Sequence, residues 1–105
     1  MIKIINDLTL DEFVEKGNSC LFFYSADFMP CNRMFDLISK IQIKFSNVKF
    51  GMIDIDACIE AEAEFNVVSV PTLILVKDGK KIEKIEGMLR EKILIEKIES
   101  LRKTK

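Results

Sequence analysis

Histidine is absent from the sequence, and cysteine is scarce, with three in 105 residues. Histidine is the usual acid or base near neutral pH and the commonest metal ligand, so its absence removes the simplest basis for either chemistry. We therefore expect no metal site and no cofactor. Three cysteines are too few, and odd in number, for a disulfide scaffold, and their scarcity fits a reducing compartment.

An excess of charge of one sign and a long apolar run are missing too. The 16 basic and 17 acidic residues give a net charge of −1, so the composition does not favour binding to nucleic acid or to an anionic membrane. The apolar runs are far shorter than the ~20 residues needed to cross a bilayer. The N-terminal residues 1–5 lack the long apolar stretch and the cleavage site of a signal peptide. We expect a cytoplasmic protein without nucleic-acid or membrane partners.

The sequence does contain enough apolar residues, 49% of the chain, to build a hydrophobic core, and we expect one domain over residues 1–105. Period-two and short apolar runs predict strands, and apolar residues three and four positions apart predict helices. The predicted strands are residues 2–5, 20–24, 48–55, 72–76 and 82–85. The predicted helices begin at a Thr9–Glu12 capping box, at Pro30 (continuing to Phe45), at Ile59 and at Arg90.

The order of these elements predicts an α/β fold with a mixed sheet between two layers of helices. Residues 20–24 are apolar on both faces, which is typical of a central strand covered on both sides. Asp78-Gly79 between the last two strands is a strong hairpin signal.

Four short motifs stand at particular places in this order. Residues 25–31 read Ser-Ala-Asp-Phe-Met-Pro-Cys between the central strand and the long helix, and residues 53–56 read Ile-Asp-Ile-Asp. Val70-Pro71-Thr72 begins the next strand, and Gly87 follows the hairpin. In this order and spacing the motifs resemble the thioredoxin family over essentially the whole chain. The resemblance implies the thioredoxin fold and a cis peptide bond at Pro71, beside the active site.

The resemblance also implies a chemistry that needs two cysteines three residues apart. The first, as a thiolate at a helix N-terminus, attacks a disulfide, and the second resolves the mixed disulfide. Cys31 matches the second cysteine. If the chain is aligned to the family without a gap, Phe28 occupies the position of the first cysteine. If one residue is deleted in the alignment instead, residues 25–28 match the stretch that precedes the first cysteine, and that cysteine is missing. Both alignments remove the attacking thiol, whereas a cysteine inserted between Phe28 and Met29 would restore the ordinary motif.

Members of the family also bury an aspartate and a lysine that help to move protons to the thiols. The matching positions here hold Phe22 or Phe23, depending on the gap, and Met52. Because a buried carboxylate is costly unless it is paired, replacing both charged groups with apolar ones stabilises the core. The same replacement removes the proton relay.

Each remaining cysteine has a structural interpretation beside a redox one. Cys20 lies in the central strand and is expected to be a small buried hydrophobe. Cys58 starts the third helix, where some family members carry a regulatory cysteine, but its companions there match Phe65 and Ser69. Cys31 is either a structural residue or a slow thiol. The helix N-terminus lowers the pKa of the Cys31 thiol and burial raises it, and we expect the effect of burial to be slightly the larger.

We interpret the sequence as a thioredoxin-like protein whose two-cysteine cycle is impaired or lost, and which binds an extended segment of a protein partner in a groove beside a cis-proline. The groove residues are Phe28, Met29, Pro30, Val70, Pro71, Gly87 and Met88. The alternative is a thiol-disulfide oxidoreductase that works in cell redox homeostasis through Cys31, with a second thiol from glutathione or a partner. Thioredoxin reductase is a partner in that alternative.

Overall fold

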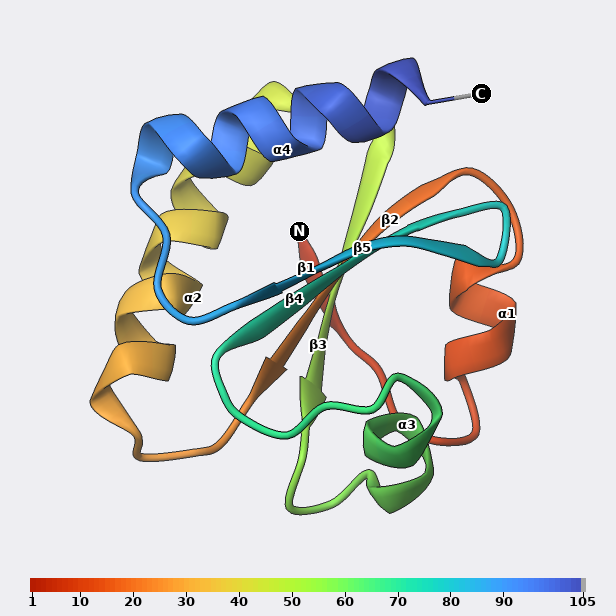
Figure 1. Cartoon of the computed structure of the whole chain (residues 1–105), viewed down its shortest axis with the longest axis vertical. Coiled ribbons are helices and arrows are strands. Elements are labelled where there is room, and N and C mark those ends of the chain that lie inside the picture. The colour runs from red at the N-terminus through yellow and green to blue at the C-terminus, as the bar shows by residue number, and fades with distance from the viewer. Residues whose placement is uncertain (105) are drawn as a thin grey trace.

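The computed structural model describes residues 1–104. Five strands and four α-helices follow one another in the order that the sequence predicts (Figure 1). The elements are β1 (Ile2–Ile4), α1 (Leu10–Val14), β2 (Asn18–Tyr24), α2 (Met29–Ile41), the 3₁₀ helix η1 (Gln42–Lys44), β3 (Val48–Asp54), α3 (Ile59–Glu64), β4 (Thr72–Lys77), β5 (Lys80–Glu86) and α4 (Glu91–Lys103).

The strands form one mixed sheet in the order β1-β3-β2-β4-β5. Strands β1 and β2 run parallel to β3, and β4 is antiparallel to β2 and β5. Helices α2 and α4 cover one face of the sheet, and α1 and α3 cover the other (Figure 1). The prediction of a mixed sheet flanked by helices on both faces is confirmed.

Strand β2 shows why the core divides into two clusters. Successive side chains of a strand point to opposite faces, so a fully apolar strand contributes to both sides of the sheet. Cys20 and Phe22 join the cluster beneath α2 and α4, whereas Leu21 and Phe23 join the cluster beneath α1 and α3. All four side chains are buried.

Two local predictions are wrong. The Thr9 side chain does not cap α1, because Thr9 already has helical backbone angles. The Asn6 side chain instead accepts hydrogen bonds from the N–H groups of Leu8 and Thr9, at 2.9 and 3.1 Å. The helix that begins near Pro30 also ends early as an α-helix, at Ile41, and its last turn tightens into η1 before Phe45.

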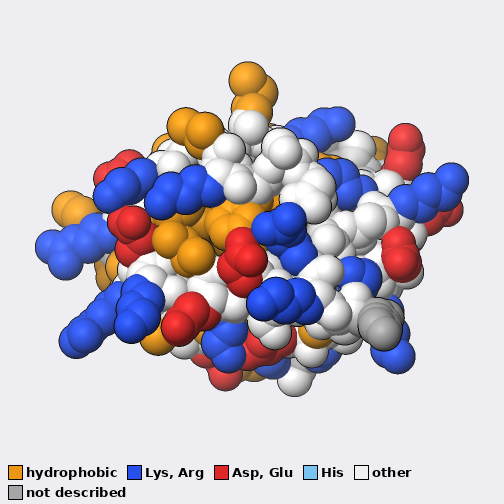
Figure 2. All heavy atoms as spheres, turned by 90° about the horizontal axis from the view of Figure 1, so that it is seen from above, with side chains coloured by type: hydrophobic (Ala, Val, Ile, Leu, Met, Phe, Trp, Pro, Cys, Tyr) orange, Lys and Arg blue, Asp and Glu red, His pale blue; other side chains and the backbone are white. Residues whose placement is uncertain are grey.

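The outer surface carries both signs of charge. On the face seen in Figure 2, lysine and arginine side chains lie among aspartate and glutamate side chains, with a hydrophobic area between them. Within residues 1–104, no helix is long and apolar enough to span a bilayer.

Candidate functional site

The loop after β2 and the start of α2 contain the motif of residues 25–31. Strand β2 ends at Tyr24, the chain turns through Asp27, and α2 begins at Met29 with Phe28 as its N-cap. Asp27 has a φ of 63°, in the left-handed region that aspartate tolerates better than most residues. The N–H of Cys31 donates to the carbonyl of Phe28 at 2.9 Å. Phe28 and Cys31 therefore lie at the two ends of the first turn of α2.

Cys31 is enclosed although it lies in the first turn. Its side chain is 2% exposed and belongs to the core cluster beneath α2 and α4. Burial raises the pKa of the Cys31 thiol, and a hydrogen bond from the backbone of Ser25 lowers that pKa by a smaller amount. The raised pKa has the direction that we expected from burial.

The peptide bond between Val70 and Pro71 is cis, as the resemblance implies. Gly87, at a φ of 88°, donates its N–H to the carbonyl of Pro71 at 2.9 Å. This hydrogen bond joins two of the predicted groove residues that are far apart in the sequence. Val70 is half-buried and packs against both core clusters.

The sheet brings the two segments to the same end of the molecule. Phe23 lies opposite Thr72 in the antiparallel β2–β4 pair, so the loop after β2 emerges beside the segment that precedes β4. Phe28, Met29 and Met88 are 44%, 60% and 46% exposed. We call the surface made by Phe28, Met29, Val70, Gly87 and Met88 around Pro71 the cis-proline face; Pro71 itself is buried, and Pro30 lies half-buried in the helix beside it.

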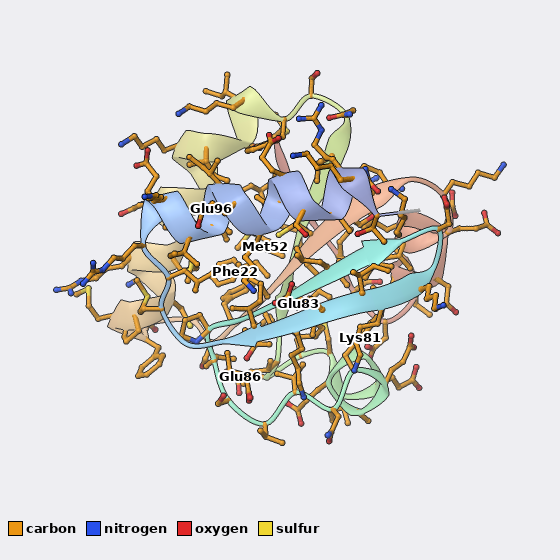
Figure 3. The ribbon with its side chains drawn as sticks, turned by 45° about the horizontal axis from the view of Figure 1, so that its top comes forward. Phe22, Met52, Lys81, Glu83, Glu86 and Glu96 are labelled. Atoms are coloured by element: carbon orange, nitrogen blue, oxygen red, sulfur yellow. The ribbon has the colours of Figure 1, made fainter. Side chains whose placement is uncertain are left out.

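The positions that match the family's proton relay are apolar and adjacent. Phe22 on β2 lies directly opposite Met52 on β3 in the parallel ladder. Both pack in the cluster beneath α2 and α4, where Figure 3 shows them next to each other. The Phe23 side chain lies on the opposite face of the sheet. Neither of these two positions carries a charged side chain that could move a proton.

A cleft of about 350 Å³ lies beside Cys31, and the sequence did not reveal it. Its lining includes Tyr24, Asn32 and Phe35, none of which belongs to the four sequence motifs. One signal was available, because Phe35 is a large apolar residue off the buried stripe of α2 and is partly exposed. A larger cavity of about 610 Å³ lies against β1, α1 and η1, and none of the predicted site residues lines it.

The other two cysteines lie away from this loop. Cys58 is the N-cap residue of α3, is buried in the cluster on the opposite face of the sheet, and donates its Sγ–H to the Ile5 carbonyl at 3.9 Å. Cys20 is buried in the middle of β2, and desolvation raises the pKa of its thiol to about 12. All three cysteines are free. Of the companion positions, Phe65 is buried and Ser69 is exposed.

Comparison with known proteins extends the likeness beyond the motifs. The family model described as Thioredoxin matches residues 1–100. This chain belongs to the thioredoxin family. Thioredoxin H2 of Arabidopsis thaliana is 34% identical over 96 residues, covering 90% of this chain and 71% of that protein. The thioredoxin of Chlamydia caviae is 28% identical over 95 residues, covering 90% and 93%.

Solved thioredoxins have the same fold. A mutant thioredoxin of Halobacterium salinarum superposes with a TM-score of 0.87 at 23% identity, covering 98% of this chain and 92% of that one. Fasciola hepatica thioredoxin gives 0.87 at 24% identity, covering 94% and 98%. Membership of this redox family implies protein partners in general.

Proposed function

We propose that this thioredoxin-family protein has lost the two-cysteine cycle and binds an extended segment of a protein partner on the cis-proline face. The observation that carries the proposal is the identity of the helix-start residue. An attacking thiolate needs the dipole and free N–H groups at a helix N-terminus. At the N-cap of α2 the chain has Phe28, one turn before Cys31.

The surroundings of Cys31 support the same proposal. A lone thiol could still exchange if it were exposed and readily ionised, but Cys31 is buried and its pKa is raised. Cys20 and Cys58 are buried in strand β2 and at the start of α3, so neither is placed to resolve a mixed disulfide at Cys31. The apolar pair Phe22–Met52 offers no proton donor or acceptor beneath the thiol.

The cis-proline face has the features of a strand-binding surface. Within residues 1–104, neither the N–H nor the C=O of Val70 has a hydrogen-bond partner, so both are free to pair with an extended backbone. Such pairing supplies affinity, and apolar pockets for alternate side chains supply specificity. Phe28, Met29 and Met88 flank these groups as exposed apolar side chains, and methionine adapts readily to different partners.

Two measurements test the proposal. With thioredoxin reductase and NADPH, the protein should not reduce insulin disulfides, and turnover within about tenfold of an ordinary thioredoxin would refute the loss of the cycle. For binding, we would select extended peptides from a displayed library against the intact protein. Met29→Asp and Met88→Asp should each weaken a selected peptide by about tenfold or more, because a carboxylate then faces apolar side chains.

Ile43→Asp is the matched control for the binding measurement. Ile43 is 82% exposed and lies in η1, beyond the far end of α2. Its substitution should leave peptide affinity unchanged. Equal losses for Ile43→Asp and Met88→Asp would show that binding does not depend on the cis-proline face.

One observation favours a second function, a single-thiol oxidoreductase. The hydrogen bond from the Ser25 backbone to the Cys31 sulfur favours the thiolate. In this alternative, the Cys31 thiolate attacks one sulfur of a partner disulfide, and the other sulfur leaves as a thiolate. Glutathione then attacks the partner sulfur of the mixed disulfide, which releases Cys31 and leaves a partner–glutathione disulfide for a second glutathione to reduce. Turnover with glutathione that Cys31→Ser abolishes would support this function over the first.

A further inference from the structure

The cleft beside Cys31 lies on the opposite side of the loop after β2 from the cis-proline face. The cleft has Phe22 and Met52 in its lining, which places it over β2 and β3. The cis-proline face adjoins β4. Since the sheet order places β3 and β4 on opposite sides of β2, the two surfaces are separate.

The walls of the cleft are mostly apolar. Phe22 and Met52 come from the sheet, and Cys31 and Phe35 come from the first two turns of α2. The Phe22 and Tyr24 rings lie 5.6 Å apart between centroids and are tilted by 30°, so two aromatic rings lie together at the sheet side. A cavity of about 350 Å³ falls within the range of small-molecule sites, about 300–1,000 Å³.

Three polar side chains join this apolar lining without partners of their own. The hydroxyl of Tyr24, the carboxylate of Asp27 and the amide of Asn32 make no hydrogen bond or ion pair within the described part of the chain. They offer at least three acceptor oxygens, whereas lysine and arginine are absent from the lining. An anion would therefore meet a carboxylate and no cation.

We propose that this cleft binds a small aromatic molecule that carries a hydrogen-bond donor and no negative charge. The aromatic and sulfur-containing walls match an aromatic ring, since rings stack on rings and sulfur contacts ring edges favourably. Asp27, Tyr24 and Asn32 match the donor. An anionic ligand would lose hydration against the apolar walls and find no ion-pair partner, whereas a cationic one would meet Asp27.

Indole is the probe that tests this site. Titrated into the ¹⁵N-labelled full-length protein, it should produce saturable shifts of the amide signals of Ala26, Asn32 and Phe35, with a midpoint on the order of 1 mM. The amide signal of Met88 should not move. Shifts confined to Val70, Gly87 and Met88, or shifts that do not saturate, would overturn the proposal.

Two matched phenylalanines locate the binding. Phe35 lines the cleft and is partly exposed, so Phe35→Ala should leave the fold intact and raise the indole midpoint by about tenfold, because one aromatic wall is lost. Phe28 is similarly exposed and belongs to the cis-proline face, so Phe28→Ala should leave the midpoint within about twofold. Unchanged binding by Phe35→Ala would refute the site.

Two charged relatives of the probe test the stated ligand class. Indole-3-carboxylate should bind at least about tenfold more weakly than indole, because of Asp27. Tryptamine, whose ammonium group can pair with the Asp27 carboxylate, should bind at least as tightly as indole. Tighter binding of indole-3-carboxylate than of indole, or weaker binding of tryptamine, would overturn the stated ligand class.

Discussion

Phe28→Cys tests the residue matching and the proposed loss of function in a single variant. Phe28 is 44% exposed, so its removal should change the free energy of unfolding by no more than about 0.5 kcal/mol. The Cys31 N–H to Phe28 carbonyl hydrogen bond closes a turn, in which the Cα atoms of the end residues lie less than about 7 Å apart. A disulfide needs Cα atoms about 4.4–6.8 Å apart. We expect the thiol introduced at position 28 to close a disulfide with Cys31 under mild oxidation.

The magnitude follows from the size of the loop. Restricting a four-residue loop in the unfolded chain is worth up to about 2 kcal/mol, the low end of the usual range for disulfides. With a urea dependence of about 1–2 kcal/mol/M, the oxidised variant should unfold roughly 1–2 M later in urea than its reduced form. Strain in the folded state would reduce this difference.

Reductase activity should return only in part. Acid–base assistance at the thiols contributes about 10²–10⁴-fold in rate, and the apolar pair Phe22–Met52 cannot supply it. Insulin reduction by Phe28→Cys should therefore remain at least about 10²-fold below that of an ordinary thioredoxin.

The control is Met29→Cys, which introduces a thiol two residues before Cys31. Residues two apart on a helix do not face each other, so this variant should not form the bond. The assay is intact mass after oxidation, where the disulfide removes two hydrogens, together with urea unfolding and insulin reduction. If Phe28→Cys fails to close while a cysteine inserted between Phe28 and Met29 succeeds, the ungapped matching is wrong.

Three further predictions concern stability and reactivity. Burial raises the pKa of Cys20 to about 12 from an ordinary value of 9.0, so above pH 9 the thiol ionises in the unfolded chain before it does in the folded protein. The free energy of unfolding should therefore fall by up to ~1.4 kcal/mol per pH unit between these two pKa values. Urea unfolding at pH 7 and 10.5 measures this fall, and an equal fall in Cys20→Ala would contradict it. Gly51→Ala should cost about 1–3 kcal/mol in urea unfolding, because its Cβ would lie 2.8 Å from Ile5 Cγ1 and 2.9 Å from Phe13 Cε2; an unchanged midpoint would show that both side chains move freely. The alkylation rate of Cys31 in the folded protein should reach half its maximum at a higher pH than that of an ordinary cysteine, and a midpoint below ~7.5 would support the single-thiol enzyme.

The sequence predicted the fold well because its signals are local and agree with one another. The fully apolar residues 20–24 predict a central strand, and β2 is central. The Asp78-Gly79 pair predicts the hairpin, and both residues have positive φ, at 50° and 80°. Capping was less predictable, because Asn6 and Thr9 both carry suitable side chains and only the chain path decides which of them accepts the hydrogen bonds.

The candidate site was predictable where it depends on motif position. The cis bond at Pro71 and the place of Cys31 in the first turn of α2 both follow from the family pattern. The cleft beside Cys31 was not predictable, since its lining comes from β2, β3, the loop and α2. The side chains that enclose this space depend on how β2, β3 and α2 twist and how far apart they lie. The hydrophobic periodicity of a single segment does not predict that arrangement.

The pair Phe22–Met52 bears on how the catalytic cycle could be lost and regained. Under the ungapped matching, the family resemblance implies that these two residues stand where other members have a carboxylate and an ammonium group. Phe22 is buried and Met52 is half-buried in an apolar cluster, so a single charge without its partner would cost several kcal/mol at position 22 and less at position 52. The Phe22→Asp change would therefore need Met52→Lys beside it, whereas a thiol at the exposed position 28 would cost little at any time. Stability thus opposes stepwise recovery of the relay and does not oppose recovery of the thiol.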